Sequence, residues 1–288
     1  MPTKTYRNKL CVITGGSSGI GLAIAELLAA EGARLLLVAR DPATLATAAE
    51  ALRQLGAAEV ATLSADVAKD DDIARLPAAI AALAPAADLV VNSAGIVSAG
   101  LLHEVPMEEW RRLHEINVLG VVRVMNAVLP AMLARAGSLA RGERAGQIVN
   151  IASAAGLVGF NGLGAYGSTK AAVVAMGESL RAELAGSRIG VTTVCPGFVK
   201  TPIAGKLKLF GRMDNARTQK FVQNWFVKNN LEAVTVARKT LTAARRNRPL
   251  VVVGRDALSG YWTKRVMPSV LDRMMARMSP KPRRNAKV

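Results

Sequence analysis

Short apolar runs rich in β-branched residues alternate with segments of helical period along most of this 288-residue chain. Runs that are apolar at every position are typical of parallel strands buried on both faces. Strands that alternate with helices predict right-handed crossovers and a doubly wound parallel α/β sheet with helices on both faces. About seven strands are expected, at Leu10–Thr14, Arg34–Ala39, Val60–Ala65, Asp88–Asn92, Gly146–Ala152, Gly190–Cys195 and Leu250–Val253.

Helices are predicted between these strands, and the longest of them contains Pro130, where we expect a kink. The predicted helices are Gly19–Ala30, Pro42–Leu55, Asp70–Leu83, Pro106 to about Ala134, Ala165–Ala185 and Val234–Arg246, with a loop at Gly137–Arg144. Residues 1–254 are expected to form one domain, in which residues about 200–230 cover a substrate site. Residues 255–288 are expected to add a basic amphipathic helix, broken at Pro268, and a basic tail, Pro280–Val288.

Composition excludes several classes of protein. Hydrophobic residues make up 51% of the chain, which is enough for a large core, so wholesale disorder is excluded. Cys11 and Cys195 lie in separate apolar runs, which excludes a disulfide framework, and two histidines are too few for a zinc site. The first residues have no apolar signal core, and no stretch approaches the roughly 18 apolar residues that span a bilayer. We therefore expect a cytoplasmic protein without a metal.

The net positive charge of the chain comes entirely from its C-terminal third. Residues 1–199 hold 17 Lys or Arg and 17 Asp or Glu, whereas residues 200–288 hold 21 basic residues and four acidic ones, which accounts for the whole net charge of +17. Such an asymmetry favours an anionic partner for this region, namely a membrane surface, a nucleic acid or an acidic substrate. The alternative is a solvated basic segment without a specific partner.

A glycine-rich turn, Thr14–Gly21, joins the first strand to the first helix. Glycines allow a tight turn and a close approach of the backbone to a ligand. The free N–H groups and the dipole of the following helix favour a pyrophosphate at this point. Because the turn lies between a buried strand and a helix at the start of a βαβ pattern, it indicates a dinucleotide site.

The pattern T-G-x-x-x-G-x-G resembles the signature of the short-chain dehydrogenase/reductase family, in its single-domain branch. Further segments fit the family in order over roughly residues 8–200, although Ser93 replaces the second asparagine of the family's N-N-A-G. These segments are Asp66-Val67, Asn92-Ser93-Ala94-Gly95, Asn117, Ser153, the Y-x-x-x-K of Tyr166–Lys170, Pro196-Gly197 and Thr201. The resemblance implies a Rossmann fold and an NAD(P)-dependent oxidoreductase that acts on CH–OH or C=O groups. It also implies a homodimer or homotetramer, formed through the helices at residues 106–134 and 165–185.

The resemblance implies four catalytic residues, Asn117, Ser153, Tyr166 and Lys170. Ser153 would donate a hydrogen bond to the substrate oxygen, Lys170 would hold the nicotinamide ribose, and Asn117 would hold a water that completes a proton relay through Lys170. The residues implied to bind the cofactor are Gly15, Ser17, Ser18, Gly19, Ile20, Arg40, Asp66, Val67, Asn92, Ala94, Gly95, Tyr166, Lys170, Pro196, Gly197, Val199 and Thr201.

Tyr166 and Lys170 are four residues apart, so they lie on one face of a helix. Transfer of a hydride to or from a carbonyl carbon also requires a proton at its oxygen, and a tyrosine has an ordinary pKa of about 10. We expect the nearby ammonium group to lower the pKa of Tyr166 by favouring the phenolate.

Ala39 stands at the end of the second strand, where an acidic residue would accept hydrogen bonds from an adenosine ribose. Arg40 follows, and a guanidinium matches a 2′-phosphate with paired hydrogen bonds. The sequence therefore favours NADP(H) over NAD(H). The alternative is that Arg40 is a solvated loop residue; in either case Asp41 caps a helix that has Pro42 at its first position.

The segment after Thr201 mixes apolar and basic residues, which favours an apolar ketone, aldehyde or alcohol, with or without an anionic head group, unless these residues only pack the lid. They are Pro202, Ile203, Leu207, Leu209, Phe210, Met213, Phe221, Trp225 and Phe226, with Lys206, Lys208, Arg212, Arg217 and Lys220.

Three functions stay open on the sequence alone. The first is a cytosolic NADP-dependent reductase. The second is the same chemistry on a lipid ketone at an anionic membrane, in a layout similar to 3-ketosphinganine reductases. The third is a non-catalytic dinucleotide sensor or nucleic-acid binder, which the intact set of Ser153, Tyr166 and Lys170 disfavours. Nucleic acid is also disfavoured because the tail from Pro280 to Val288 contains no aromatic residue.

Overall fold

The structure, a computed structural model, describes residues 5–140, 143–203, 205, 207–220 and 231–277. Within these residues seven parallel strands form one sheet in the order β11-β7-β6-β4-β1-β2-β3. This confirms the predicted doubly wound sheet, and the predicted strands are correct to within about two residues. The strands are β1 Leu10–Thr14, β2 Arg34–Ala39, β3 Glu59–Ser64, β4 Leu89–Asn92, β6 Gly146–Ile151, β7 Ile189–Pro196 and β11 Leu250–Val253.

The order of the strands reverses between β1 and β4. The chain runs outward from β1 through β2 to β3 and then returns to the other side of β1 to form β4. Thr14 pairs with Asn92 across this junction, and Asn92 pairs with Asn150 of β6, so these strands end at the same edge of the sheet. In open α/β sheets a crevice for ligands forms outside the carboxyl ends of the strands at such a reversal.

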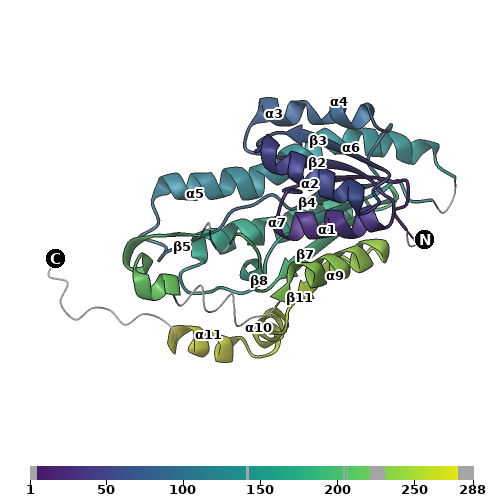
Figure 1. The fold of residues 1–288 in the computed structure, drawn as a ribbon. Coiled ribbons are helices and arrows are strands. Elements are labelled where there is room, and N and C mark those ends of the chain that lie inside the picture. Colours follow the sequence, from purple (N-terminus) through teal and green to yellow (C-terminus); the bar gives the residue numbers. More distant parts are fainter. Residues whose placement is uncertain (1–4, 141–142, 204, 206, 221–230, 278–288) are drawn as a thin grey trace.

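Helices cover both faces of the sheet (Figure 1). In β1, Leu10 and Val12 belong to one hydrophobic core and Cys11 and Ile13 to the other, which is why the strand is apolar at every position. One core contains α1, α2 and α9, and the other contains α3, α4, α6 and α7. The helices are α1 Gly19–Ala30, α2 Pro42–Gln54, α3 Asp70–Ala74, α4 Leu76–Ala81, α5 Met107–His114, α6 Gly120–Ser138, α7 Gly164–Glu183, α9 Ala233–Arg245, α10 Arg255–Val266 and α11 Pro268–Arg277.

The helix expected over Asp70–Leu83 is in fact two short helices, α3 and α4, which meet at Arg75. Pro77 lies in the first turn of α4, where its missing N–H group costs no hydrogen bond. The break predicted at Pro268 is confirmed, because α10 ends at Val266 and α11 begins with that proline.

Pro130 does not end the helix, because α6 continues through it to Ser138, and the kink expected there stays a prediction. The helical pattern changes instead at Glu115–Leu119, a π-helical segment between α5 and α6. Such segments insert one extra residue into a turn and are frequent at functional sites. Because α6 extends to Ser138, the loop predicted from Gly137 begins two residues later.

The expectation that no segment has the length and apolar character to span a bilayer also needs correction. The continuous helix Met107–Ser138 passes both criteria. However, its α6 portion packs into the sheet, with Val121, Val124, Val128 and Met132 buried in the core. A helix that packs in a protein core passes the same two criteria, so they do not by themselves make this helix a membrane span.

Two short strand pairs lie beside the main sheet and were not predicted. β5 (Ser98–Ala99) pairs with β9 (Lys208–Leu209), and β8 (Val199–Lys200) pairs with β10 (Leu231–Glu232). The β5–β9 pair fixes part of the expected lid to the loop that follows β4. Several residues of the sequence predictions lie outside the described residues: Lys206, Phe221, Trp225, Phe226, Met278 and the tail Pro280–Val288.

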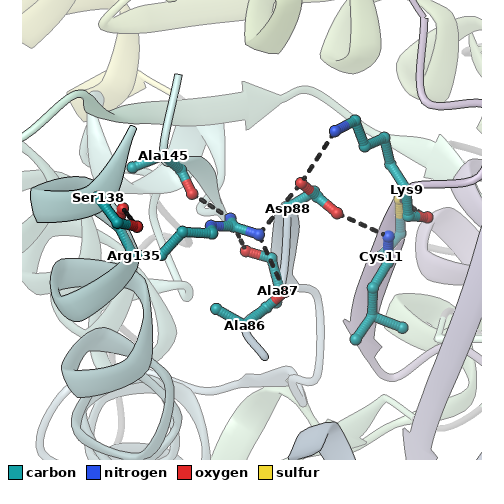
Figure 2. Close-up of polar contacts among 9 residues, drawn as sticks. Lys9, Cys11, Ala86, Ala87, Asp88, Arg135, Ser138 and Ala145 are labelled. Atoms are coloured by element: carbon teal, nitrogen blue, oxygen red, sulfur yellow. Dashed lines mark hydrogen bonds and ion pairs between the residues drawn. The ribbon is translucent and has the colours of Figure 1, made fainter. Parts of the chain in front are cut away.

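Arg135 of α6 ties the amino ends of the strands together, at the edge opposite the crevice (Figure 2). Its guanidinium donates to the carbonyl oxygens of Ala86, at 3.1 Å, and of Ala87, at 2.6 Å, and to that of Ala145. It also pairs with Asp88, whose other carboxylate oxygen accepts from the backbone N–H of Leu10 at 2.9 Å. One arginine thus holds the entries to β1, β4 and β6 in register.

We predict that Arg135→Ala lowers the free energy of unfolding by about 2–4 kcal/mol, because three carbonyl groups and Asp88 lose a charged donor together. Urea denaturation measures this loss. Arg111→Ala is the control, because Arg111 is exposed and its side chain makes no hydrogen bond or ion pair with the described residues. Equal stability of the two variants would contradict the role assigned to Arg135.

Candidate active site

The turn after β1 approaches the loop after β4 closely. Gly15 has φ +66°, and a Cβ at this position would lie 2.9 Å from the backbone nitrogen of Ala94. Thr14 fixes the same approach, because its Oγ1 accepts hydrogen bonds from the N–H groups of Ser93 and Ala94, both at 3.2 Å. The two strands on either side of the reversal are therefore joined at their carboxyl ends.

The first turn of α1 presents free backbone N–H groups at this edge. Ser18 is the N-cap residue, but its side chain accepts no capping hydrogen bond, and the first turn contains no acidic residue. The positive end of the helix dipole is thus not compensated by the chain's own side chains. A glycine turn followed by an uncapped helix end fits a pyrophosphate group.

A cavity of about 1730 Å³ runs from this helix end, past the ends of β1, β4, β6 and β7, to the segment after Thr201. Most of the residues expected in the site line it: Gly15, Ser17, Ser18, Gly19, Ile20, Arg40, Asp66, Val67, Ala94, Gly95, Ser153, Tyr166, Lys170, Pro196, Gly197, Val199 and Thr201. Of the expected lid, the described residues Pro202, Ile203, Leu207, Lys208, Arg212, Met213 and Arg217 also line it. Asn92 and Asn117 do not.

Arg40 lies exposed at the end of β2, and its guanidinium makes no hydrogen bond or ion pair with any residue that the structure describes. The two carboxylates of this part of the wall are engaged elsewhere. Asp41 caps α2 by accepting from the N–H of Ala43 at 3.0 Å, as predicted, and Asp66 accepts from the N–H of Ala68 at 3.0 Å. Of these three charged side chains, Arg40 is the one without a hydrogen-bond partner among the described residues.

Asn117 lies in the π-helical segment and is fully buried. Its Oδ1 accepts from the N–H of Ile96 at 2.9 Å, and its Nδ2 donates to the carbonyl oxygen of Ile96 at 2.9 Å and to Oγ1 of Thr169 at 3.1 Å. It thus fastens the loop after β4 to α7. Asn92 is also buried and donates to Oδ1 of Asn150 at 2.8 Å. Both asparagines therefore lie behind the residues that line the cavity and hold them in position through hydrogen bonds.

Ser153, Tyr166 and Lys170 meet where β6 ends against α7. Oγ of Ser153 accepts from the N–H of Ala155 at 3.1 Å, which leaves its own O–H group as a donor. Lys170 is almost fully buried and donates to the carbonyl oxygen of Ile151 at 3.0 Å. Its Nζ lies 5.9 Å from the centre of the Tyr166 ring.

Burial is the largest influence on the pKa values of Tyr166 and Lys170. It raises the pKa of Tyr166 to about 12, although a hydrogen bond with Ser153 acts in the opposite direction. Burial also lowers the pKa of Lys170 to about 8. The expected fall in the pKa of Tyr166 is therefore not found, because desolvation of the phenolate outweighs the hydrogen bond with Ser153, which is the one influence that lowers this pKa. At neutral pH this site holds a neutral phenol beside a charged lysine.

Three contacts from the C-terminal helices reach the site and were missed from the sequence. Oδ2 of Asp256 accepts from the N–H of Phe198 at 3.3 Å. Lys264 donates to the carbonyl oxygen of Leu157 at 2.7 Å, four residues after Ser153, and Met275 lines the cavity. Nothing in the local sequence signals such contacts, since they join residues up to 107 positions apart.

Taken together, the glycine turn, the uncapped start of α1 and the cavity at the reversal of strand order fit a dinucleotide. Among the described residues no cluster of three His, Cys, Asp or Glu side chains could hold a metal ion. Cys11 and Cys195 are both free and buried.

The comparisons with known proteins agree with this geometry. The family model for short chain dehydrogenases matches residues 9–210. The 2-(R)-hydroxypropyl-CoM dehydrogenase of Xanthobacter autotrophicus is 38% identical over 199 residues, which are 68% of this chain and 76% of that protein.

Two solved structures are also similar. A short chain dehydrogenase/reductase from Burkholderia phymatum in complex with NAD has a TM-score of 0.82 at 28% identity, and the match covers 98% of this chain and all of that one. L-Sorbose reductase from Gluconobacter frateurii, complexed with NADPH and L-sorbose, has a TM-score of 0.73 at 28% identity, over 87% and 96% of the two chains. This chain belongs to the short-chain dehydrogenase/reductase family and is an NAD(P)-dependent oxidoreductase of alcohols and ketones.

Proposed function

We propose that the enzyme uses NADP(H) to reduce an apolar ketone or aldehyde, with Tyr166 as the proton donor. The observation that carries this proposal is the meeting of Ser153, Tyr166 and Lys170 at one wall of a large cavity. The apolar side chains of Phe160, Leu163, Ile203, Leu207 and Met213 line the same cavity.

In this mechanism the substrate carbonyl carbon gains a hydride and its oxygen gains a proton, so the product is an alcohol. A bound nicotinamide supplies the hydride. Tyr166 gives its phenolic proton to the oxygen, and the O–H group of Ser153 donates a hydrogen bond that stabilises the negative charge developing there. The neutral phenol and the raised pKa of Tyr166 suit a proton donor in the reductive direction.

Lys170 and Asn117 would return a proton to Tyr166. The ammonium group of Lys170 favours the phenolate left after the transfer and would hold the nicotinamide ribose. Asn117 Oδ1 uses one lone pair for Ile96. A Cβ on Gly95 would lie 3.2 Å from this oxygen and 3.4 Å from Nζ of Lys170, so both atoms face the backbone of Gly95. A water held by the second lone pair would complete a relay between Asn117 and Lys170.

The remaining cavity residues would hold the dinucleotide: Gly15, Ser17, Ser18, Gly19, Ile20, Asp66, Val67, Ala94, Gly95, Pro196, Gly197, Val199 and Thr201. We propose that Arg40 selects NADP(H), because its unpaired guanidinium lies at the ribose end of the cavity where Ala39 replaces an acidic residue. Asn92 would act indirectly, through Asn150.

A lipid ketone is the second candidate substrate, in the manner of a 3-ketosphinganine reductase. It is favoured by Met275, which brings a further apolar side chain from α11 to the cavity. We further propose a cytoplasmic homodimer or homotetramer. Exposed Met107, Leu119 and Leu133 along the helix Met107–Ser138 favour a contact between subunits. Residues 1–254 would form the catalytic domain and residues 255–288 an addition to it.

Replacing Tyr166 with Phe removes the proton donor and leaves the ring in place. We predict that kcat falls by about 10²–10⁴-fold while the dissociation constant for NADPH changes little. NADPH oxidation over apolar aldehydes, ketosteroids, quinones and long-chain β-keto compounds measures the first quantity, and fluorescence titration the second. Tyr261→Phe, a change outside the cavity, is the control; turnover by Tyr166→Phe at the wild-type rate would refute the role of Tyr166.

Reversing the charge at Arg40 tests the cofactor assignment. Arg40→Asp should lower the ratio of kcat/KM for NADPH to that for NADH by roughly 100-fold, because paired charged hydrogen bonds are lost and a carboxylate repels the phosphate. Steady-state kinetics with both cofactors gives the ratio. Arg238→Asp, at an exposed site of α9, should leave it unchanged. An unchanged ratio in Arg40→Asp would assign the phosphate to another residue.

The pH dependence follows from the two pKa shifts. Lys170 loses its charge as the pH rises through about 8, whereas Tyr166 keeps its proton to about 12. We therefore predict that kcat/KM for reduction is constant below about pH 8 and falls up to tenfold per pH unit above it. A profile that stays flat from neutral pH to about pH 10 would show that the charge of Lys170 is not needed.

A further inference from the structure

The last two helices carry a concentrated set of exposed apolar side chains. Half of the exposed large hydrophobic residues on the described surface lie in α10, α11 and the residue between them: Leu258, Trp262, Val266, Met267, Val270 and Met274. Trp262 is 57% exposed and Val266 68% exposed. Leu258, Trp262 and Val266 follow one another at intervals of four residues, and so do Val270 and Met274, so each helix presents one apolar stripe.

Basic residues accompany these stripes. Arg265 follows α10's exposed tryptophan by three residues, and Arg273 and Arg277 lie on α11. The segment 255–288 contains nine Lys or Arg and two Asp, which gives it a net charge of +7. One of the two acids, Asp256, turns inward to the N–H of Phe198, which leaves Asp272 as the one other carboxylate of the segment.

The inner side of the same helices touches the active site. Lys264 binds the carbonyl oxygen of Leu157, and Gly260 lies against Val158, so α10 rests on the turn that follows Ser153. Met275 of α11 lines the cavity, while Met274 beside it is half exposed. Figure 1 shows both helices at one margin of the molecule, outside the layers that cover the sheet.

We propose that α10 and α11 dock the enzyme on an anionic lipid bilayer. The apolar stripes enter the boundary between headgroups and acyl chains, with Trp262 at the interface that tryptophan prefers, and the arginines meet lipid phosphates. A second copy of the chain is a poorer occupant, because a two-fold contact would bring two strongly basic surfaces together. In the docked enzyme the cavity would lie next to the bilayer, because Met275 of α11 lines it. The docking itself needs neither the reaction nor the cofactor.

Vesicle flotation of the full-length protein tests the proposal, with phosphatidylcholine vesicles that do or do not contain phosphatidylserine. We expect flotation with the anionic vesicles, reduced by added salt, and little with the neutral ones. The doubles Trp262→Ser/Val266→Ser and Arg265→Glu/Arg273→Glu should each weaken the partition coefficient about tenfold or more. Leu55→Ser, at the exposed C-cap of α2, and Arg238→Glu, at an exposed site on α9, are the matched controls and should bind as the wild type does.

A depth measurement adds a second readout. Lipids brominated on their acyl chains should quench tryptophan fluorescence in the wild type, and Trp262→Phe should lose most of that quenching while it still floats. Turnover of a soluble ketone without vesicles, together with circular dichroism, separates a failure of docking from a failure of folding or of the proposed reaction.

Three kinds of result would overturn the proposal. The first is a failed flotation test, either with wild-type protein that stays unbound with anionic vesicles or with binding that both double variants retain. The second is a dimer that Trp262→Ser/Val266→Ser converts to monomers in the absence of lipid, since the face would then belong to a second copy. The third is tight binding of duplex DNA at physiological salt that is lost in the charge variant alone, since the partner would then be a nucleic acid.

Discussion

A buried ammonium group one helical turn from a buried phenol is the interaction on which this site depends. Lys170 is held in place by the carbonyl oxygen of Ile151, the last residue of β6, so the sheet itself fixes its position. Tyr166 shares the same helix face, and Ser153 lies two residues beyond Ile151. Desolvation makes both charged forms costly, so the resting pair is a neutral phenol and a lysine close to losing its proton.

The sheet also brings the glycine turn after β1 close to the wall that carries Tyr166 and Lys170. The reversal between β1 and β4 opens the crevice, and Thr14 closes the distance between the two strand ends. Asn117 then links the loop after β4 to α7, which carries Tyr166 and Lys170. The glycine-turn end and the Tyr166 end of the cavity are therefore connected by hydrogen bonds of buried side chains, while the segment after Thr201 and α11 also line the cavity.

The sequence was sufficient wherever the signal is local. Strand positions follow from continuous apolar runs, the turn Thr14–Gly21 follows from its glycines, and the pairing of Tyr166 with Lys170 follows from their spacing. Contacts between distant residues could not be predicted in this way. The π-helical segment around Asn117, the β5–β9 pair and the reach of Lys264 to Leu157 depend on how separate elements pack. The direction of the pKa shift of Tyr166 was predicted wrongly for the same reason, because the burial that raises this pKa depends on the whole fold.

A crystal structure with NADP⁺ and a bound ketone or alcohol tests the central claim most directly, through the distances from the substrate oxygen to Oη of Tyr166 and Oγ of Ser153. The account predicts that both are hydrogen-bond distances, roughly 2.5–3.2 Å, with Lys170 still on the carbonyl oxygen of Ile151. A substrate oxygen bound by other groups, with the hydroxyl of Tyr166 turned away from it, would contradict the account.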